Sequence, residues 1–450
     1  MHYVKTSGPL QPGDTVFSIT LHENLNLDIE PYHLNLIALS PCANFLYIAV
    51  GSTIQVYKLL DDNHPFTLIS QIPSSETSPT SINYIHRHYS PNNSLLCSVH
   101  NSGSALIHCL NSSSIISLET GESAWGCSID DSTIPLVAVS NNSKNVTIFD
   151  LHHETLPSTL SSFHNHNIPS IYFQFPFLAT SSIDGHVRLF NTTTNELIFS
   201  HSPSDQWGWS VELIEFKYFI RNKLPVLAPN QSPSSSDSSL QRPSLAHSIN
   251  VRRFLQQLGS LEVEYEDVGE ITLRLFEELQ REEGFYSEEE EEDDVIDDVA
   301  VKFSGESFRN IILYGTKTSL FCYNLMLNPS SPFKIFKNLI PKIIPGAYAI
   351  NRLSLIETLH LLGIVLVASQ GSFLIAVLRF GENLDGKFDL LHEGFIDFSN
   401  IVPNFLESPI AGISSSFITN SHPCLYRVSV LFLNGVVIVF DLSLFSKFDK

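Results

Sequence analysis

The sequence predicts an all-β fold, a seven-bladed β-propeller, from a repeated hairpin pattern, its spacing and one long gap in that spacing. Seven times a short apolar run meets a small or polar turn and returns as a second apolar run that ends in an aromatic or aliphatic residue. The clearest copy is ATSSIDGHVRLFN at 179–191. Self-similar units about 40 residues apart are typical of blades arranged radially.

The spacing of the hairpins supports a count of seven blades. The other six copies lie at 49–59, 98–110, 138–151, 313–325, 367–380 and 431–442. The residues that end the returning strands are Tyr57, His108, Phe149, Phe190, Tyr323, Leu378 and Phe440, which are 51, 41, 41, 133, 55 and 62 positions apart. Only the gap of 133 exceeds one blade of about 40–45 residues with ordinary loops. Removing the 76 residues 225–300 leaves 57, which one long blade can absorb.

The expected organisation is one propeller interrupted by one insertion. Residues 15–224 hold blades one to four and the start of the fifth, 225–300 form the insertion, and 301–450 hold blades five to seven. Only eight residues follow Leu442, too few for a full outer strand. Because apolar residues alternate in Thr15–Leu21, as on a strand, we expect this segment to pair into the last blade and close the ring.

The insertion has a composition of its own. It begins with a Ser- and Pro-rich linker at Gln231–Pro243, followed by two segments with apolar residues at helical spacing, at 248–258 and 271–284. The two expected short helices either pack together or on the side of the propeller, or present one helix to a groove of a partner.

The negative charge is concentrated in the same insertion. Of a net charge of −22, the stretch from Glu262 to Asp298 contributes −16, with 18 acidic residues against two arginines, and the rest of the chain −6. Its acidic run is Glu288, Glu289, Glu290, Glu291, Glu292, Asp293 and Asp294. We expect this run to be solvated, either as a solubilising loop or as a docking tail for a basic partner protein.

Targeting and membrane signals are not visible in the sequence. The segment MHYVKTSGPLQPGD lacks an apolar signal core, and the apolar stretch Leu359–Phe380 has a polar centre, Ser369–Ser372, which predicts two strands around a turn rather than a membrane helix. The six cysteines are spread singly, which favours a reduced intracellular protein of the nucleus, the cytoplasm or both.

Motifs for chemistry are also absent from the sequence. The segment GESAWG lacks the Lys-Ser/Thr of a phosphate-binding loop, and neither HExxH nor GxSxG occurs. We therefore expect no enzyme and no cofactor, with a propeller hydrolase as the lesser alternative. The sequence has no basic stripe of the kind that would indicate direct nucleic-acid binding. His164 and His166 have the spacing of two metal ligands on a strand, but a third ligand is not evident, and we assign no metal.

The clearest hairpin resembles the WD-repeat family. Blades of that family commonly carry a His before the second strand, a Ser or Thr within it, an Asp in the following turn and a Trp that ends the third strand. Aligning on the turn Asp184-Gly185 places His164, Ser170, Asp184 and Phe190 at these positions. Because Phe190 replaces the tryptophan, the resemblance implies a buried structural triad of His164, Ser170 and Asp184.

A second resemblance, over a shorter part of the chain, concerns the biological role of the protein. The segments GESAWG at 121–126, HNIPSI at 166–171 and WGWSV at 207–211 contain all three tryptophans, Trp125, Trp207 and Trp209. They are similar to a fungal WD-like family of regulators of ribonucleotide reductase gene transcription. This implies a largely nuclear regulator that acts through protein contacts with chromatin or transcription components, and makes the tryptophans and the acidic run the candidate interaction surface. A structural explanation is also open, in which large rings are wedged where backbones approach closely.

A second non-enzymatic class is the substrate receptor of a cullin-type ubiquitin ligase. Many such receptors carry Trp-Asp-x-Arg at the end of a third strand, where the arginine pairs with an adaptor. The corresponding segments here, at 149–152 and 440–443, read FDLH and FDLS and lack the arginine. The receptor function therefore stands as the alternative to the regulatory scaffold.

Overall fold

The computed structural model divides the chain into two compact units, Met1–Ile214 with Ile311–Lys450, and Glu215–Asn310. The residues it describes all belong to the first unit. They are 2–3, 15–31, 33–59, 65–73, 80–89, 94–130, 135–151, 157–161, 164–203, 207–214, 311–325, 331–340, 342–344, 351–356, 364–382, 388–400, 402, 405–418 and 425–444. The expected linker, helices and acidic run of the insertion lie outside these residues.

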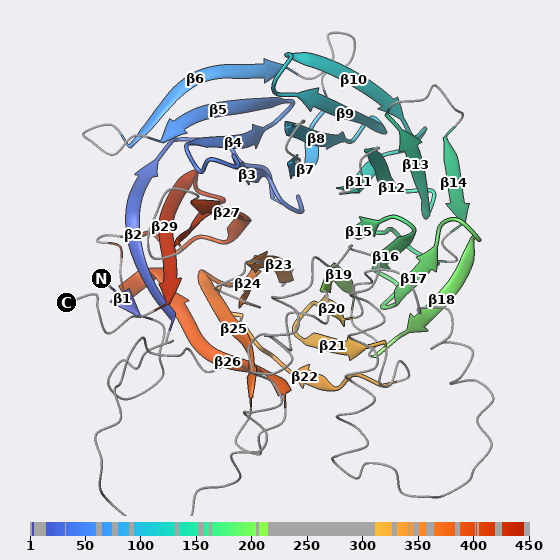
Figure 1. Cartoon of the computed structure of the whole chain (residues 1–450). Coiled ribbons are helices and arrows are strands. Elements are labelled where there is room, and N and C mark those ends of the chain that lie inside the picture. Colours follow the sequence, from blue (N-terminus) through green and yellow to red (C-terminus); the bar gives the residue numbers. More distant parts are fainter. Residues whose placement is uncertain are drawn as a thin grey trace, which may run out of the picture. The chain divides into compact units, whose positions relative to one another are not determined.

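The first unit is a seven-bladed β-propeller of the WD-repeat type, as the sequence predicts (Figure 1). Its seven antiparallel sheets are named blades A to G here, in chain order. Blades A to D comprise β3 (Ile37–Leu39), β4 (Phe45–Val50), β5 (Thr53–Leu59) and β6 (Phe66–Pro73); β7 (Ile82–Tyr89), β8 (Ser94–His100), β9 (Ser104–Cys109) and β10 (Ser114–Glu119); β11 (Ala124–Ile129), β12 (Leu136–Asn141), β13 (Asn145–Asp150) and β14 (Ser158–Ser161); and β15 (Ser170–Gln174), β16 (Phe177–Ser181), β17 (Val187–Asn191) and β18 (Glu196–His201).

The remaining three sheets complete the ring. Blades E to G comprise β19 (Gly208–Ile214), β20 (Ile311–Thr316), β21 (Leu320–Asn324) and β22 (Lys334–Phe336); β23 (Asn351–Ile356), β24 (Ile364–Ser369), β25 (Leu374–Glu382) and β26 (Phe388–Asp397), which a 3₁₀ turn η1 (Phe398–Asn400) follows; and β27 (Ile410–Ile418), β28 (Leu425–Phe432), β29 (Val436–Leu444), β2 (Thr15–Asn24) and β1 (His2–Tyr3). The apolar stretch 359–380 thus contributes two strands of blade F around a turn, as expected.

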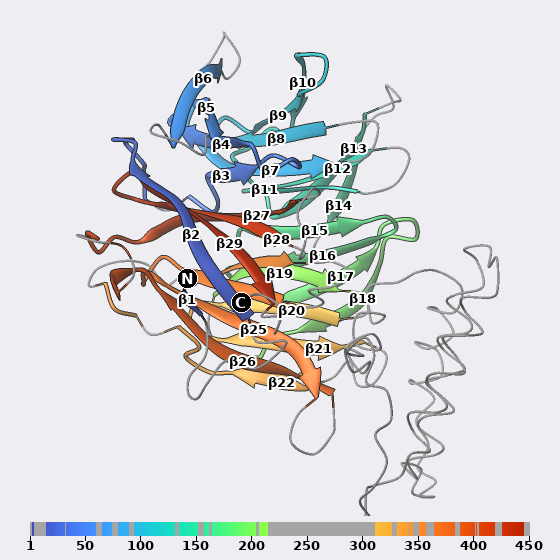
Figure 2. The ribbon, with the colours of Figure 1, turned by 60° about the vertical axis from the view of Figure 1, so that its left-hand side comes forward.

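In blades A to F the strands follow chain order, and in blade G the order is β27, β28, β29, β2 and β1. The first strand lies nearest the centre of the ring and the last at its rim (Figures 1 and 2). Each innermost strand contacts the innermost strand of the next blade, around the whole ring. Blade E is built from both sides of the long gap, because β19 ends at Ile214 and its partner β20 begins at Ile311.

The ring is closed by a strand from the amino-terminal region. The segment Thr15–Leu21, for which the sequence indicates this position, lies within β2, and β2 pairs antiparallel with β29 as the fourth strand of blade G. Phe17 is 2% exposed and packs edge-to-face on Phe440 of β29, with ring centroids 5.9 Å apart. Hydrogen bonds and apolar packing thus both join the two ends of the ring.

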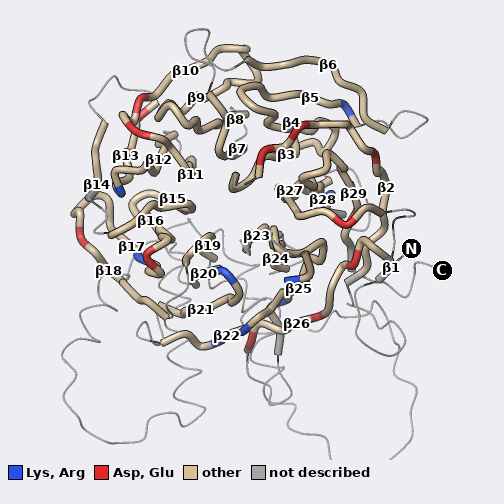
Figure 3. Tube along the Cα trace, turned by 180° about the vertical axis from the view of Figure 1, so that it is seen from behind, with Lys and Arg blue, Asp and Glu red and all other residues tan. Residues whose placement is uncertain are grey.

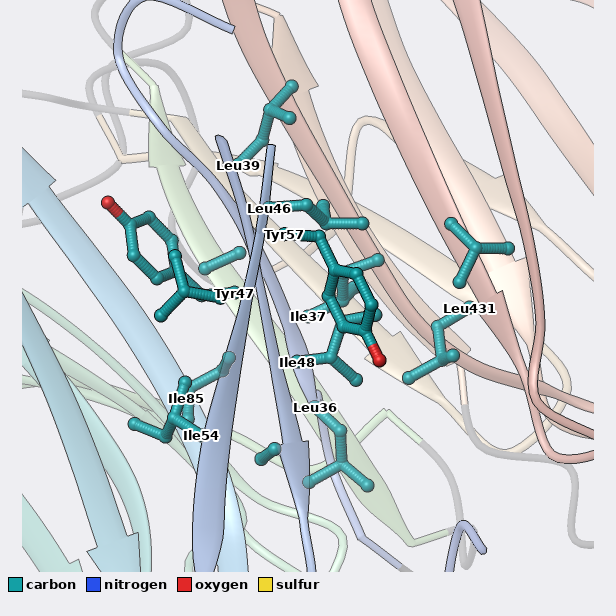
Figure 4. Packing of buried hydrophobic residues seen from close by; sticks show 14 of the residues in the cluster. Leu36, Ile37, Leu39, Leu46, Tyr47, Ile48, Ile54, Tyr57, Ile85 and Leu431 are labelled. Carbon is teal, nitrogen blue, oxygen red and sulfur yellow. The ribbon is translucent and has the colours of Figure 1, made fainter. Parts of the chain in front are cut away.

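The core lies between the blades, where each sheet is covered on both faces. Figure 4 shows this for blade A, where Ile54 points toward Ile85 of blade B and Tyr57 points toward Leu431 of blade G. Both faces of β4 and β5 are therefore apolar, which explains why the hairpins read as continuous apolar runs rather than as strict alternation. Burying such side chains is the main stabilising term of a fold of this kind.

Candidate functional site

The histidine singled out by the sequence belongs to a buried polar network at one end of blade D. His164 lies in the loop before β15, and Asp184 lies in the turn between β16 and β17. His164 Nδ1 is 3.1 Å from Asp184 Oδ2, and His164 Nε2 is 2.8 Å from the hydroxyl of Thr180 on β16. His164 Nδ1 also lies within hydrogen-bond distance of Arg188 Nη1, which can only donate, so this nitrogen faces both the carboxylate and the guanidinium, while Nε2 bonds the Thr180 hydroxyl.

Charge in this network is held on Asp184 rather than on His164. Burial lowers the pKa of His164, more than the nearby carboxylate raises it. Burial alone would raise the pKa of Asp184, but hydrogen bonds from His164 and from the backbone N–H groups of Asn165 and His186 hold it well below its usual range. Arg188 Nη1, 3.6 Å from Asp184 Oδ2, supplies the balancing positive charge. The arrangement orders the turn, and its atoms are engaged internally.

The position of Ser170 corrects the expected triad. Ser170 is the first residue of β15 and pairs with Ser181, whereas the neighbouring Ile171 pairs with Thr180. Because adjacent residues of a strand face opposite sides, the hydroxyl of Ser170 points away from His164. The sequence alignment placed the hydroxyl on β15, but the residue that completes the network is Thr180 on the next strand, β16. Phe190, at the place of the family's tryptophan, is fully buried in the apolar core between blades.

Ser170 has a different partner, which sequence reasoning missed. Its Oγ accepts a hydrogen bond of 3.2 Å from the backbone N–H of Val211 on β19. Equivalent bonds run from Phe173 N–H to Ser128 at 3.0 Å and from Leu39 N–H to Ser414 at 3.0 Å. The innermost strand of each blade is a sheet edge with unpaired amides. In these three places a serine of one innermost strand satisfies an amide of the next and ties two blades together.

Two of the three tryptophans lie together near the axis of the ring. Trp209 is 9% exposed and packs in one cluster with Trp125. The other members, each from a different blade, are Leu34, Tyr84 and Ile183. Trp125 and Trp209 are the second residues of β11 and β19, so the cluster lies at the end of the ring where the innermost strands begin. Five blades thus contribute apolar side chains to one cluster at this end of the ring.

The glycine between two of the tryptophans has a steric reason. A Cβ atom on Gly208 would come within 2.8 Å of the carbonyl oxygen of Ser182 in blade D. The backbones of blades D and E therefore approach closely here, and only glycine fits. This agrees with the structural explanation of the Trp-Gly pairs for Trp209.

Trp207 is different because its side chain is 44% exposed. Its ring stacks edge-to-face on Trp209, with centroids 6.1 Å apart, and the ammonium of Lys317 lies 5.7 Å from the ring centroid. Such a cation–π pair holds an exposed ring in place at a small energetic gain. Of the candidate interaction surface, Trp207 is the tryptophan that a partner can reach. The acidic residues 288–294 lie outside the described residues.

A buried arginine joins three blades at the same end of the channel. Arg352 on β23 of blade F is 6% exposed and donates to the carbonyl of Ile410 in blade G, at 2.6 Å, and to the carbonyl of His33, which precedes blade A. Burial lowers the pKa of Arg352 to about 9, so the side chain stays cationic at pH 7. Gln370 also donates to His33, at 3.1 Å. Backbone carbonyls thus accept from both terminal nitrogens of the guanidinium, while its buried Nε has no hydrogen-bond partner among the described residues.

Blade B contains a second buried histidine network that sequence reasoning missed. The hydroxyl of Ser98 lies 3.0 Å from His100 Nε2 and 3.2 Å from His108 Nε2, and His100 Nδ1 lies 3.4 Å from the carbonyl of Thr80. All three of these hydrogen bonds can form when each imidazole ring carries one proton. His108 Nδ1 is then a buried acceptor with no partner. The available signal was that His108 stands where the other hairpins end in an apolar side chain.

This network should make the folded state sensitive to acid. Burial, helped by the nearby His100, lowers the pKa of His108 to about 4, and burial also lowers the pKa of His100. Since an unfolded histidine has a pKa near 6.5, the unfolded chain binds more protons between pH 6.5 and 4. Stability is therefore complete above pH 6.5 and falls as the pH drops, by about 3 kcal/mol for His108 at pH 4.

The check is the thermal midpoint measured from pH 7.5 to pH 4.5. We expect His108→Gln to flatten the pH dependence relative to the native chain, and the exposed-site control His166→Gln to leave it unchanged. Equal pH dependence in the native chain and His108→Gln would contradict this account. The difference between variants matters, because other carboxyl and imidazole groups titrate in the same range.

Neither a metal site nor a membrane-spanning helix is present among the described residues. There, no group of three or more His, Cys, Asp or Glu side chains is arranged to hold a metal ion. His166, the second histidine of the tested pair, is exposed and accepts from the backbone N–H of Asn167. Within the same residues, no helix is long and apolar enough to cross a bilayer.

Comparison with known proteins agrees with the fold. No family model matches the chain. A WD40 repeat-containing protein of Dictyostelium discoideum is 31% identical over 196 residues, which is 42% of this chain and 28% of that protein. The crystal structure of Raptor from Chaetomium thermophilum covers 94% of this chain and 29% of its own, with a TM-score of 0.53 and 13% identity. At that identity the second likeness concerns the fold alone, and the chain spans less than a third of either protein.

Proposed function

We propose that this chain is a non-enzymatic interaction scaffold that regulates transcription through protein contacts. The observation that carries the proposal is the exposed Trp207, held by Lys317 and by Trp209, which belongs to an apolar cluster formed by five blades. An exposed, immobilised aromatic ring is a typical anchor of a protein interface. The sequence similarity to a WD40 repeat-containing protein and the propeller fold support the same class.

The polar side chains near the apolar cluster give the hydrolase alternative less support. General acid–base catalysis needs titratable side chains within hydrogen-bond reach of a bound substrate. Arg352, which lies near Tyr84 of the cluster, donates to backbone carbonyls, and the ionised Asp184 is engaged by His164 and Arg188. The geometry therefore favours recognition at the surface over chemistry in the channel.

The identity of the partner class is the finer part of the proposal. The three tryptophan-containing and neighbouring segments resemble fungal regulators of ribonucleotide reductase genes, which supports chromatin or transcription components as partners in the nucleus or cytoplasm. The ligase-receptor alternative has less support, since Asp441, the second residue of the segment 440–443, accepts hydrogen bonds of 2.9 and 3.2 Å from Arg427 of its own blade.

Purification of the tagged full chain from cells, followed by mass spectrometry, tests the proposal. We expect chromatin or transcription components to copurify with the native chain. Recovery of cullin and adaptor subunits instead would establish the receptor function. Turnover of substrate by the purified chain would contradict the non-enzymatic assignment.

A further inference from the structure

Three exposed lysines lie on the part of blade E that carries Trp207. Lys317 occupies the turn between β20 and β21, and Lys337 and Lys342 lie in the segment that follows β22. We call these three residues the basic rim. Backbone hydrogen bonds hold both segments in place: Lys317 N–H donates to the carbonyl of Trp207 at 3.1 Å, and Leu339 N–H donates to that of Thr318 at 3.1 Å.

The charge of this region is opposite to that of the chain. Over the described residues 207–214, 311–325, 331–340 and 342–344 there are four lysines and one glutamate, a net charge of +3, whereas the whole chain has −22. Figure 3 shows basic segments on the blades that contain β20–β22 and β25. A local field of this sign attracts an acidic ligand and repels a basic one.

The basic rim is accompanied by exposed apolar surface. Besides Trp207, Ile343 is 38% exposed, and its N–H donates to the carbonyl of Gly371 in blade F at 2.9 Å. One end of the basic rim is thus anchored to blade E and the other to blade F. Apolar anchors with charged neighbours on a rigid backbone are what a short peptide segment needs for specific binding.

The cation–π pair favours a ligand with negative charge. The ammonium of Lys317 already occupies the neighbourhood of the Trp207 ring, so a cationic side chain would have to displace it. A carboxylate can instead bind the same ammonium and leave the pair intact. The ring face that would attract a basic peptide is therefore used by the protein itself.

We propose that the basic rim and Trp207 bind an acidic peptide segment of a partner protein, with an apolar residue of that segment on Trp207 and its carboxylates at the lysines. The proposal rests on the scaffold function and names the chemical class of one partner. It concerns lysines of the described residues, whereas the sequence predicts for the acidic run 288–294 either a solubilising loop or a docking tail for a basic partner.

The test is fluorescence anisotropy with the full chain and a labelled short peptide in which one leucine is flanked by glutamates and aspartates. We expect saturable binding that weakens as salt is raised. Trp207→Ala and the triple variant Lys317→Glu, Lys337→Glu, Lys342→Glu should each raise the dissociation constant at least about tenfold, or 1.4 kcal/mol. Lys58→Glu, an exposed lysine on β5 of blade A, is the matched control and should leave it unchanged.

Several outcomes would overturn the site. One is that the native chain and the triple variant bind the acidic peptide equally while having equal thermal midpoints. A second is that the native chain binds equally well a peptide in which lysines replace the acidic residues. A third is that it binds a single-stranded oligonucleotide in preference to the acidic peptide. Copurification separates this failure from failure of the scaffold function. If the triple variant retains the native partners, the scaffold stands and the acidic-peptide site is wrong.

Discussion

Deletion of residues 1–25 is expected to abolish cooperative thermal unfolding at the native midpoint. The deletion removes β2, and with it the only partner that β29 has on its outer side. Blade G would become a three-stranded sheet with an exposed edge, and Phe440 would lose the ring of Phe17 that packs on it. Because a folded domain is stable by only about 5–15 kcal/mol, loss of a complete buried strand removes a large part of that margin.

Point substitutions within β2 distinguish packing from backbone pairing. Phe17→Ala should destabilise the chain by about 3–5 kcal/mol, since the side chain is almost fully buried. His22→Ala in the same strand is the matched control, because its side chain is exposed, and we expect a change within about 0.5 kcal/mol. Melting is followed by circular dichroism. An unchanged melting curve after the deletion would contradict the closing role of β2.

Substitution of Arg352 by methionine is expected to cost about 1–3 kcal/mol. The guanidinium donates to carbonyls of Ile410 and His33, which belong to segments far apart in the chain that meet where blades F, G and A come together. Methionine fills a similar volume but leaves the carbonyl of Ile410 buried without this donor. The loss should therefore appear as weaker contact between blades rather than as a local defect.

The comparison that tests this explanation uses a lysine and a second arginine. Arg352→Lys keeps a positive charge but cannot donate with the planar fork of arginine, so we expect most of the loss to remain. Arg427→Met leaves the buried carboxylate of Asp441 without its partner and should cost more, about 3–5 kcal/mol. Chemical denaturation with a fixed m-value gives the free energies. Stability of Arg352→Met equal to that of the native chain would contradict the bridging role.

The propeller itself could be predicted because its signal is local and repeated. Each hairpin has apolar runs on both sides of a short turn, and seven copies of a weak pattern make a strong one. The spacing also located the interruption of blade E, and the alternation in Thr15–Leu21 indicated a strand whose partner the structure identifies as β29. Composition, by contrast, could not locate a binding surface, because it does not distinguish an exposed tryptophan from a buried one.

The candidate network was only partly predictable. His164 and Asp184 could be predicted because their positions are counted along the sequence from one turn. The residue that supplies the hydroxyl could not, because it depends on where the strands begin, and a shift of one residue moves a side chain to the other face of the sheet. That is why Ser170 was chosen in place of Thr180. The His100 and His108 network was missed for a related reason, since its members become neighbours only after β8 and β9 pair.

The sequence by itself determined the architecture of this protein, because strand, turn and repeat period are encoded within a few tens of residues. Tertiary structure alone decided which residues face a partner and which hold the ring together. Trp125 belongs to blade C and Trp207 and Trp209 to blade E, and Arg352 acts on carbonyls hundreds of positions away or in the next blade. Burial and charge at those positions depend on how seven sheets converge at one end of a channel, and no stretch of sequence contains that convergence.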